Sequence, residues 1–241
     1  MGFPAKVILR RIVKHGKAQK LGMSHFPSRG QTARQELYVY QDQKLFLKGV
    51  SDKNHENCRI NQHSGTLAER EFWAFCIAKY LKLLVPSLCL LDKKTTVQVW
   101  LPIPDAFLFT SRTGPLKLST QDVYDCGLFD WVTGQQDRHN ANYLYDFVHE
   151  KIILIDCANS FLKYSPALPH YLENFEVGHK SELDGEVASS LQKKIIKTPE
   201  KIWRQLVPLR SPEERDALLL RVQKMGLVKT VRDLIRLFRE T

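Results

Sequence analysis

The chain has 241 residues, a hydrophobic content of 43% and a formal net charge of +10 at pH 7. A chain of this length can bury a core without disulfides or a structural metal, and its composition is ordinary for a globular protein. No apolar run approaches the ~20 residues of a membrane-spanning helix, so the sequence predicts no such helix. The five cysteines include no CxxC pair, which favours reduced thiols over a disulfide framework.

The first part of the chain is predicted to be rich in strands. Residues 6–13, KVILRRIV, have the composition of a strand. Residues 36–50 alternate between apolar and polar side chains and turn at Asp42, which predicts a β-hairpin. Between these strands, residues 25–35 form a polar loop that contains Gly30.

A helix is predicted to begin after Thr66. Glu69 follows Thr66 by three residues, as in a capping box, and the helix is expected to end before Pro86. Two apolar runs follow, residues 85–91 and residues 95–103. Only the second run contains enough β-branched residues to predict a strand, and Pro102 and Pro104 end the pattern.

The second half of the chain is predicted to be mainly helical. Residues 121–132 have apolar side chains at helical spacing and Gly134 suits the helix end. Two short strands then form a hairpin, residues 142–146 and residues 151–156. Three further helices are predicted over residues 191–207, 211–226 and 226–238.

These elements predict an α+β chain with two lobes. Residues 1–101 form the strand-rich lobe and residues 102–241 the mainly helical one, which together make one domain. A cleft between two lobes is a common place for a ligand to bind.

Polar side chains gather at the ends of the predicted hairpin. Asn142 begins its first strand and Asp156 ends its second, so pairing of the strands brings the two side chains together. Amide and carboxylate oxygens suit Mg²⁺, which takes one or two protein ligands together with substrate phosphates. Asp137, five residues before Asn142, is then free to accept a proton from an attacking hydroxyl.

A lysine and a glutamate in the first lobe have an order that suits phosphate binding. Lys48 ends the second strand of the hairpin and Glu71 lies on the helix that follows. Glu69 competes for the same role, but the helix cap occupies it and leaves Glu71 to pair with Lys48. The backbone N–H groups of the earlier loop are candidates to cover phosphates. That loop consists of Ser28, Arg29, Gly30 and Gln31.

These motifs resemble those of known kinase families. The sequence DRHNAN at residues 137–142, followed by ILID at residues 153–156, resembles the catalytic and metal-binding segments of phosphoinositide kinases and their protein-kinase relatives. LFDWVTGQQDRH is similar to secretory-pathway kinases related to the Golgi casein kinase. EFWAFCIAKYLKLLVP is similar to the glutamate-bearing helix of HipA-type kinases. The resemblance covers about residues 28–161 and implies a protein-kinase-like fold that uses ATP and Mg²⁺.

The resemblance also implies roles for individual residues. Lys48 would bind the nucleotide phosphates and Glu71 would pair with it. Residues 97–103 would be the hinge that contacts adenine, through Val99, Trp100 and Leu101.

In the second half, the resemblance makes Asp137 the catalytic base and Asn142 and Asp156 the Mg²⁺ ligands. His139 would support the loop or the transferred phosphate. The chain departs from the family pattern after Asp156, where Cys157 and an alanine replace Phe-Gly. Its phosphate loop also has a single glycine. The secretory kinases carry an acid at the position of Asn142, so the phosphoinositide-kinase pattern fits this chain better.

Several functions remain open on the sequence. The leading interpretation is an atypical kinase acting on protein Ser or Thr, and the alternatives are a phosphoinositide lipid kinase, an AMP-transferring enzyme and a non-catalytic nucleotide-binding module. The basic charge leaves an acidic membrane surface open as a partner, and no nucleic acid is expected. The expected location is the cytoplasm, with membrane association left open.

Overall fold

The computed structural model describes residues 19–21, 33–40, 42–50 and 64–240. The chain divides into two compact units. Unit 1 comprises Met1–Phe72 and Pro86–Pro102, and unit 2 comprises Trp73–Val85 and Ile103–Thr241. The predicted strand over residues 6–13 and the predicted phosphate loop over residues 28–31 lie outside the described residues.

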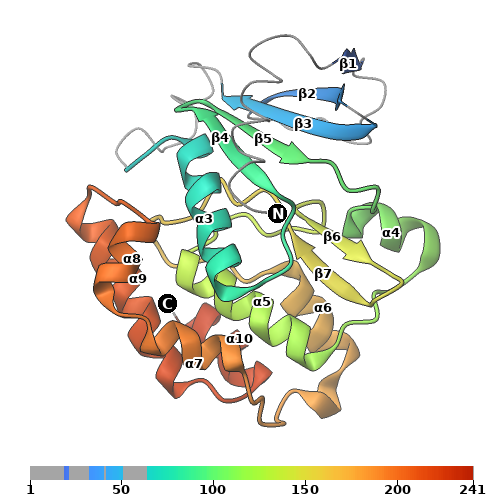
Figure 1. The fold of residues 1–241 in the computed structure, drawn as a ribbon. Helices are drawn as coiled ribbons and strands as arrows, with labels where there is room; N and C mark the ends of the chain where they lie inside the picture. Colours follow the sequence, from blue (N-terminus) through green and yellow to red (C-terminus); the bar gives the residue numbers. More distant parts are fainter. Residues whose placement is uncertain (1–18, 22–32, 41, 51–63, 241) are drawn as a thin grey trace. The chain divides into compact units, whose positions relative to one another are not determined.

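Unit 1 contains a five-stranded antiparallel sheet with the order β1-β2-β3-β5-β4 (Figure 1). Its strands are β1 (Gln19–Leu21), β2 (Ala33–Tyr40), β3 (Gln43–Val50), β4 (Leu88–Asp92) and β5 (Thr95–Val99). The predicted hairpin is confirmed, because Tyr40 pairs with Gln43 around Asp42, whose φ is 62°. The first apolar run also forms a strand, β4, although its composition did not predict one. Buried side chains on the sheet form a small core of Leu45, Cys89, Leu91 and Val97.

Helix α3 (Leu67–Leu81) begins in unit 1 and ends in unit 2. The predicted capping box is present. The Glu69 backbone N–H donates to Thr66 Oγ1 at 3.1 Å, and the Thr66 backbone N–H donates to Glu69 Oε2 at 2.9 Å. The helix stops at Leu81, before Pro86 as expected, and the next residue, Lys82, has a φ of 67°.

Unit 2 is built around helix α5 (Thr120–Thr133), whose C-terminal half, residues 126–133, is entirely buried. It packs against strand β7 (Lys151–Leu154) and against four helices of the same unit, α6 (His170–Gly178), α7 (Ser190–Lys197), α9 (Pro212–Lys224) and α10 (Val231–Arg239) (Figure 1). The Ser119 side chain caps its start by accepting from the Asp122 N–H. Gly134 ends it in the left-handed conformation, with φ 64°, as the sequence predicts.

Replacing Gly134 with alanine should destabilise the protein by about 2–4 kcal/mol. The left-handed backbone costs an L side chain about 1–2 kcal/mol. A Cβ at this position would also overlap the Arg221 guanidinium, which donates to the carbonyls of Leu162 and Tyr164. Urea unfolding measures the change. Gly226→Ala is the control, because a Cβ there meets nothing within 4 Å, and a loss no larger than the control's would contradict the prediction.

Strands β6 (Tyr143–Asp146) and β7 (Lys151–Leu154) form the predicted antiparallel hairpin. Tyr143 pairs with Leu154, so Asn142 and Ile155 flank the same end of it. Helix α4 (Ala106–Thr113) was not predicted, because the sequence indicated only a break at the prolines. Asp105 caps this helix by accepting from the Leu108 N–H at 2.7 Å.

The C-terminal helices of unit 2 correct two predictions. The helix expected over residues 191–207 is two helices, because Pro199 has no N–H to continue the first. The helix expected over residues 226–238 begins only at Val231, after a capping box between Thr230 and Asp233. The helices are α6 (His170–Gly178), α7 (Ser190–Lys197), α8 (Glu200–Leu206), α9 (Pro212–Lys224) and α10 (Val231–Arg239). The start of α9 at Ser211 is confirmed.

The described structure is therefore α+β, with an antiparallel sheet in unit 1 and mainly helices in unit 2, as the sequence predicted. Among the described residues, no helix combines the length and apolar character needed to cross a membrane. The four described cysteines are free thiols.

Candidate functional site

The loop between α5 and β6 holds Asp137, His139 and Asn142 in direct contact with one another. The Asn142 side chain donates from Nδ2 to the Asp137 carbonyl at 2.8 Å, and its backbone N–H donates to the His139 carbonyl at 2.9 Å. His139 Nδ1 in turn accepts from the Ala141 N–H at 3.2 Å. Because Nδ2 of Asn142 is used as a donor, the amide oxygen is the atom that this buried side chain can offer to a cation.

Asp137 presents its carboxylate at the surface of unit 2. Its side chain and that of His139 are each about half exposed. His139 Nε2 lies 3.6 Å from Asp137 Oδ1, and Asn159 Nδ2 donates to Asp137 Oδ2 at 3.4 Å. An exposed carboxylate held by two polar neighbours is suited to accept a proton from a bound molecule.

Arg138 ties this loop to the segment that follows β7 and carries Asp156. Its buried guanidinium makes two hydrogen bonds of 2.9 Å to the Asp130 carboxylate on α5. From Nη1 it donates to the Asn142 carbonyl at 2.5 Å and also to the Ile155 carbonyl. One side chain thus joins the two strands at one end of the β6–β7 hairpin and fixes that end to α5.

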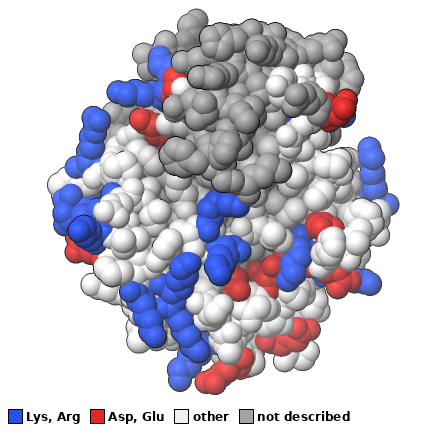
Figure 2. Space-filling view, in the orientation of Figure 1, with Lys and Arg blue, Asp and Glu red and all other residues white. Residues whose placement is uncertain are grey.

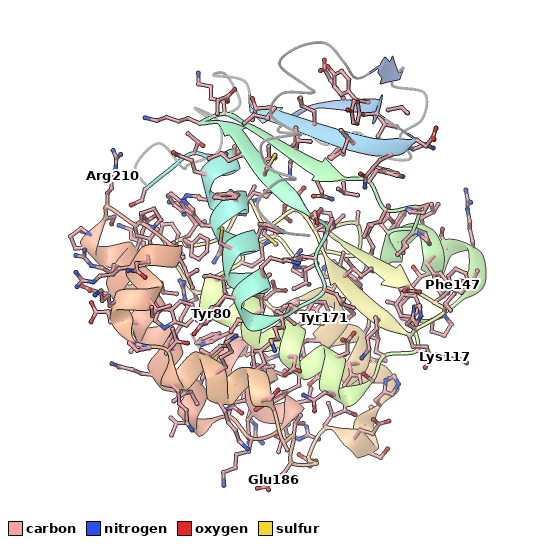
Figure 3. All side chains as sticks on the ribbon, viewed as in Figure 1. Tyr80, Lys117, Phe147, Tyr171, Glu186 and Arg210 are labelled. Atoms are coloured by element: carbon pink, nitrogen blue, oxygen red, sulfur yellow. The ribbon has the colours of Figure 1, made fainter. Side chains whose placement is uncertain are left out.

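The charge of Arg138 is balanced inside unit 2. Burial by itself lowers the pKa of Arg138, but the Asp130 carboxylate, with smaller effects from Cys157 and Tyr171, raises that pKa well above its usual value. Tyr171, labelled in Figure 3, donates its hydroxyl to Asp130 Oδ2 at 2.7 Å. Burial and the nearby Asp130 raise the pKa of Tyr171, so this hydroxyl stays protonated and keeps donating. Arg138 Nη2 also lies 3.1 Å from Cys157 Sγ.

Asp156 follows β7 in a left-handed backbone conformation, with φ 50°. Non-glycine residues rarely adopt this conformation, and such strain is concentrated at functional sites. The Gln135 side chain holds the turn by donating from Nε2 to the Asp156 carbonyl at 3.1 Å. Asp156 directly follows Ile155, whose carbonyl is bound by Arg138, so it lies at the same hairpin end as Asn142.

Unit 1 brings together the other predicted pair. Lys48 Nζ on β3 lies 3.4 Å from Glu71 Oε1 on α3, and the two side chains are only 11% and 6% exposed. Thr96 Oγ1 on β5 donates to Glu71 Oε2 at 3.0 Å. Glu69 is occupied by the helix cap, as expected. A lysine held by a buried acid is a positioned positive charge that suits a phosphate group.

The predicted hinge is partly committed to hydrogen bonds within unit 1. The Val99 N–H donates to the Ser87 carbonyl at 2.8 Å, and the Trp100 N–H donates to the Lys44 carbonyl at 2.9 Å. The Trp100 ring lies tilted against Phe46, with centroids 6.0 Å apart. Any contact of these two residues with a ligand would therefore use their carbonyls or side chains. Leu101, the third predicted hinge residue, directly follows Trp100. The Ser28–Gln31 segment is outside the described residues.

Sequence reasoning missed several residues that hold these groups in place. They are Thr96, Asp130, Gln135 and Tyr171. A signal existed for Asp130, an acid in the middle of an apolar stretch of a helix, because a buried carboxylate requires a partner. Thr96 is opposite Lys48 in the strand register, which only the sheet pairing reveals.

Comparisons with known proteins do not identify a family. No family model and no curated protein matches the sequence. Among solved structures, the Helicobacter pylori proinflammatory kinase CtkA is similar at 12% identity and a TM-score of 0.45, over 92% of this chain and 96% of that one.

Two further structures are similar at the same level. The Rio2 kinase from Chaetomium thermophilum, in a complex with ADP/Mg²⁺ and phosphoaspartate, has 17% identity and a TM-score of 0.43, over 96% of this chain and 74% of that one. CtTel1 in its open conformation has 11% identity and a TM-score of 0.46, over 87% of this chain and 11% of that one. At these values the similarities establish neither a family nor an activity.

Proposed function

We propose that this chain is an ATP- and Mg²⁺-dependent phosphotransferase, a protein kinase of an atypical, phosphoinositide-kinase-like type. The observation that carries the proposal is the position of Asp137, Asn142 and Asp156 close to one end of the β6–β7 hairpin. The buried Lys48–Glu71 pair, on a strand and on the helix that follows it, supports the same reading. In this proposal residues 1–101 and 102–241 are the two lobes of one catalytic domain.

The residues present fit a magnesium site of the kinase type. No group of three or more His, Cys, Asp or Glu side chains that could hold a metal ion occurs in the described part of the chain. A site made by Asn142 and Asp156 alone is typical of Mg²⁺, which fills its coordination with water and phosphate oxygens. When bound there, Mg²⁺ would neutralise charge on the phosphates.

The chain's own groups would supply the remaining chemistry. Asp137 would orient the acceptor hydroxyl and take its proton, and Asn142 keeps the loop closed by bonding to the Asp137 carbonyl. Lys48 would bind phosphate oxygens, with Glu71 holding its ammonium group in place. His139, in contact with the Asp137 carboxylate, would support the loop or the transferred phosphate.

We favour a protein hydroxyl over an inositol lipid as the acceptor. Residues 157–169, between Asp156 and α6, would border the acceptor and contain one cation, Lys163. Inositol phosphate headgroups are bound by clusters of lysine and arginine, which this segment lacks. In this proposal adenine lies beside Val99, Trp100 and Leu101. The nucleotide phosphates lie beside Ser28, Arg29, Gly30 and Gln31.

A labelled-ATP assay tests the proposed function. The full chain is incubated with Mg²⁺ and ATP labelled at either the γ or the α phosphate, with casein and a Ser/Thr peptide library as protein acceptors and phosphatidylinositol vesicles as the lipid. Transfer of the γ label to protein supports the proposal. Transfer to lipid would overturn the protein acceptor, and transfer of the α label would identify an AMP transferase. ATP-dependent thermal stabilisation without any transfer would identify a non-catalytic binding module.

Replacing Glu71 with glutamine should lower the rate of phosphate transfer by about tenfold or more, which is ~1.4 kcal/mol in activation free energy. The substitution keeps the size of the side chain and its contact with Thr96 but removes the charge that holds Lys48. Initial rates of γ-label transfer measure the effect. Glu69→Gln is the matched control, because Glu69 only caps α3; equal rates for the two variants would contradict the role of Glu71.

A further inference from the structure

The C-terminal end of α3 packs against α7 within unit 2. Lys194 Nζ donates to the Tyr80 carbonyl and lies 4.1 Å from the centroid of the Tyr80 ring. The Tyr80 hydroxyl lies 3.1 Å from Thr198 Oγ1. Tyr80 is labelled in Figure 3 on the lower part of α3. This contact places the last turn of α3 beside the second half of α7.

Four exposed lysines lie within three residues of this contact in the sequence, Lys79 and Lys82 at the end of α3, and Lys193 and Lys197 on α7. We call them the α3/α7 basic surface. Figure 2 shows lysine and arginine side chains gathered over this part of the molecule. Residues 72–91 and 187–199 contain no acid at all. The cations are therefore not balanced by acids from their own segments.

The four lysines form no ion pair with any described acid, unlike three other lysines of unit 2. Lys117, Lys151 and Lys229 each lie within 4.0 Å of an acid, namely Glu150, Asp122 and Glu186. Like charges that gather without partners raise the local positive potential and attract an anionic partner.

The same two chain segments also carry two exposed apolar side chains. Leu84 is 53% exposed and Ile196 is 45% exposed. Ile196 is adjacent to Lys197, and Leu84 follows Lys82 by two residues. The opposite side of α7 is anchored in the interior by Leu191 and Ile195. Lysines beside exposed aliphatic groups are the composition of a helix that rests on a lipid headgroup layer.

We propose that the α3/α7 basic surface binds the headgroup layer of an anionic lipid membrane. The mixture of lysine and exposed aliphatic side chains favours a bilayer over an acidic protein, because a protein carboxylate is better matched by the planar fork of arginine. Lysine chains can extend along the surface and place their ammonium groups among lipid phosphates while Leu84 and Ile196 enter the boundary layer. Each lysine near an anionic surface strengthens binding by about fivefold.

Vesicle co-sedimentation of the full chain, without ATP, tests this proposal separately from catalysis. We expect binding to phosphatidylcholine vesicles that contain phosphatidylserine, weak binding to pure phosphatidylcholine, and loss of binding as salt rises. Changing all four surface lysines to glutamine should weaken binding about 100-fold or more. Leu84→Ser with Ile196→Ser should weaken it about tenfold.

A charge-matched variant separates a local surface from net charge. It changes to glutamine four exposed lysines that lie outside the α3/α7 basic surface, namely Lys44, Lys117, Lys180 and Lys229. We expect it to keep most of the vesicle binding. Equal losses in the two quadruple variants, or no vesicle binding by the unaltered chain, would overturn the proposal. Tighter binding to polyglutamate or to RNA than to vesicles would also overturn it, in favour of a different partner.

Circular dichroism and thermal unfolding of each variant check that the fold is kept, since all the substituted side chains are exposed. The same variants should transfer phosphate to a soluble acceptor at the unaltered rate, because none of them changes a residue of the proposed active site. Failure of the unaltered chain to bind vesicles, with normal phosphate transfer, would therefore contradict only the membrane proposal. Vesicle binding by that chain without phosphate transfer would contradict only the proposed enzymatic function.

Discussion

Replacing Asp137 with asparagine should lower the rate of phosphate transfer by roughly 10²–10⁴-fold while leaving ATP binding almost unchanged. The amide keeps the shape of the side chain but cannot accept the proton of the attacking hydroxyl. Lys48, Asn142 and Asp156, which the proposal assigns to phosphates and Mg²⁺, remain in place. Single-turnover transfer of the γ label measures the rate, and ATP-dependent thermal stabilisation measures binding.

A surface carboxylate away from the loop provides the control for this experiment. Asp216 is exposed on α9, and Asp216→Asn should transfer phosphate at the unaltered rate. Asp137 is itself about half exposed, so its replacement should change the free energy of unfolding by no more than about 0.5 kcal/mol. Full activity of Asp137→Asn would remove the proposed base and with it the proposed mechanism.

Replacing Arg138 with methionine should be among the most destabilising single changes in the chain, with a loss of about 3–5 kcal/mol. The substitution leaves the buried Asp130 carboxylate without the guanidinium that binds it through two hydrogen bonds of 2.9 Å. It also removes the donor to the carbonyls of Asn142 and Ile155. For a chain of this length the midpoint of thermal unfolding should fall by roughly 10 °C.

An exposed arginine and a double variant complete this test. Arg204 forms an exposed ion pair with Glu200, so Arg204→Met should cost no more than about 1 kcal/mol. Combining Arg138→Met with Asp130→Leu removes both buried charges and should recover part of the lost stability. Phosphate transfer should stay low in the double variant, because the loop and β7 are no longer tied together. Recovery of full transfer would show that Arg138 contributes to stability alone.

The sequence by itself determined the parts of the fold that depend on neighbours three or four residues apart. Thr66 and Glu69 form the expected capping box, Ser211 caps α9, and Gly134 ends α5 in the left-handed conformation. The two hairpins were predictable for the same reason, since alternating side chains and a short turn specify local pairing. The break at Pro199 was equally local, although the helical spacing on both sides concealed it.

For the candidate site, the order of the motifs was enough to nominate the polar groups but not what holds them. Lys48 and Glu71 are 23 residues apart and do form an ion pair. Their contact with Thr96 follows only from the pairing of β3 with β5. The roles in catalysis assigned to these residues and to Asp137, Asn142 and Asp156 stay predictions.

Only the tertiary structure showed the buried network of Asp130, Arg138 and Tyr171. Tyr171 meets Asp130 across 41 residues of sequence, and Arg138 binds carbonyls from two different segments. Whether a charged side chain is buried or solvated depends on which elements pack over it, and local periodicity carries no information about that. Burial without a partner is costly, so the fold that encloses Arg138 must also supply its acid and its carbonyl acceptors.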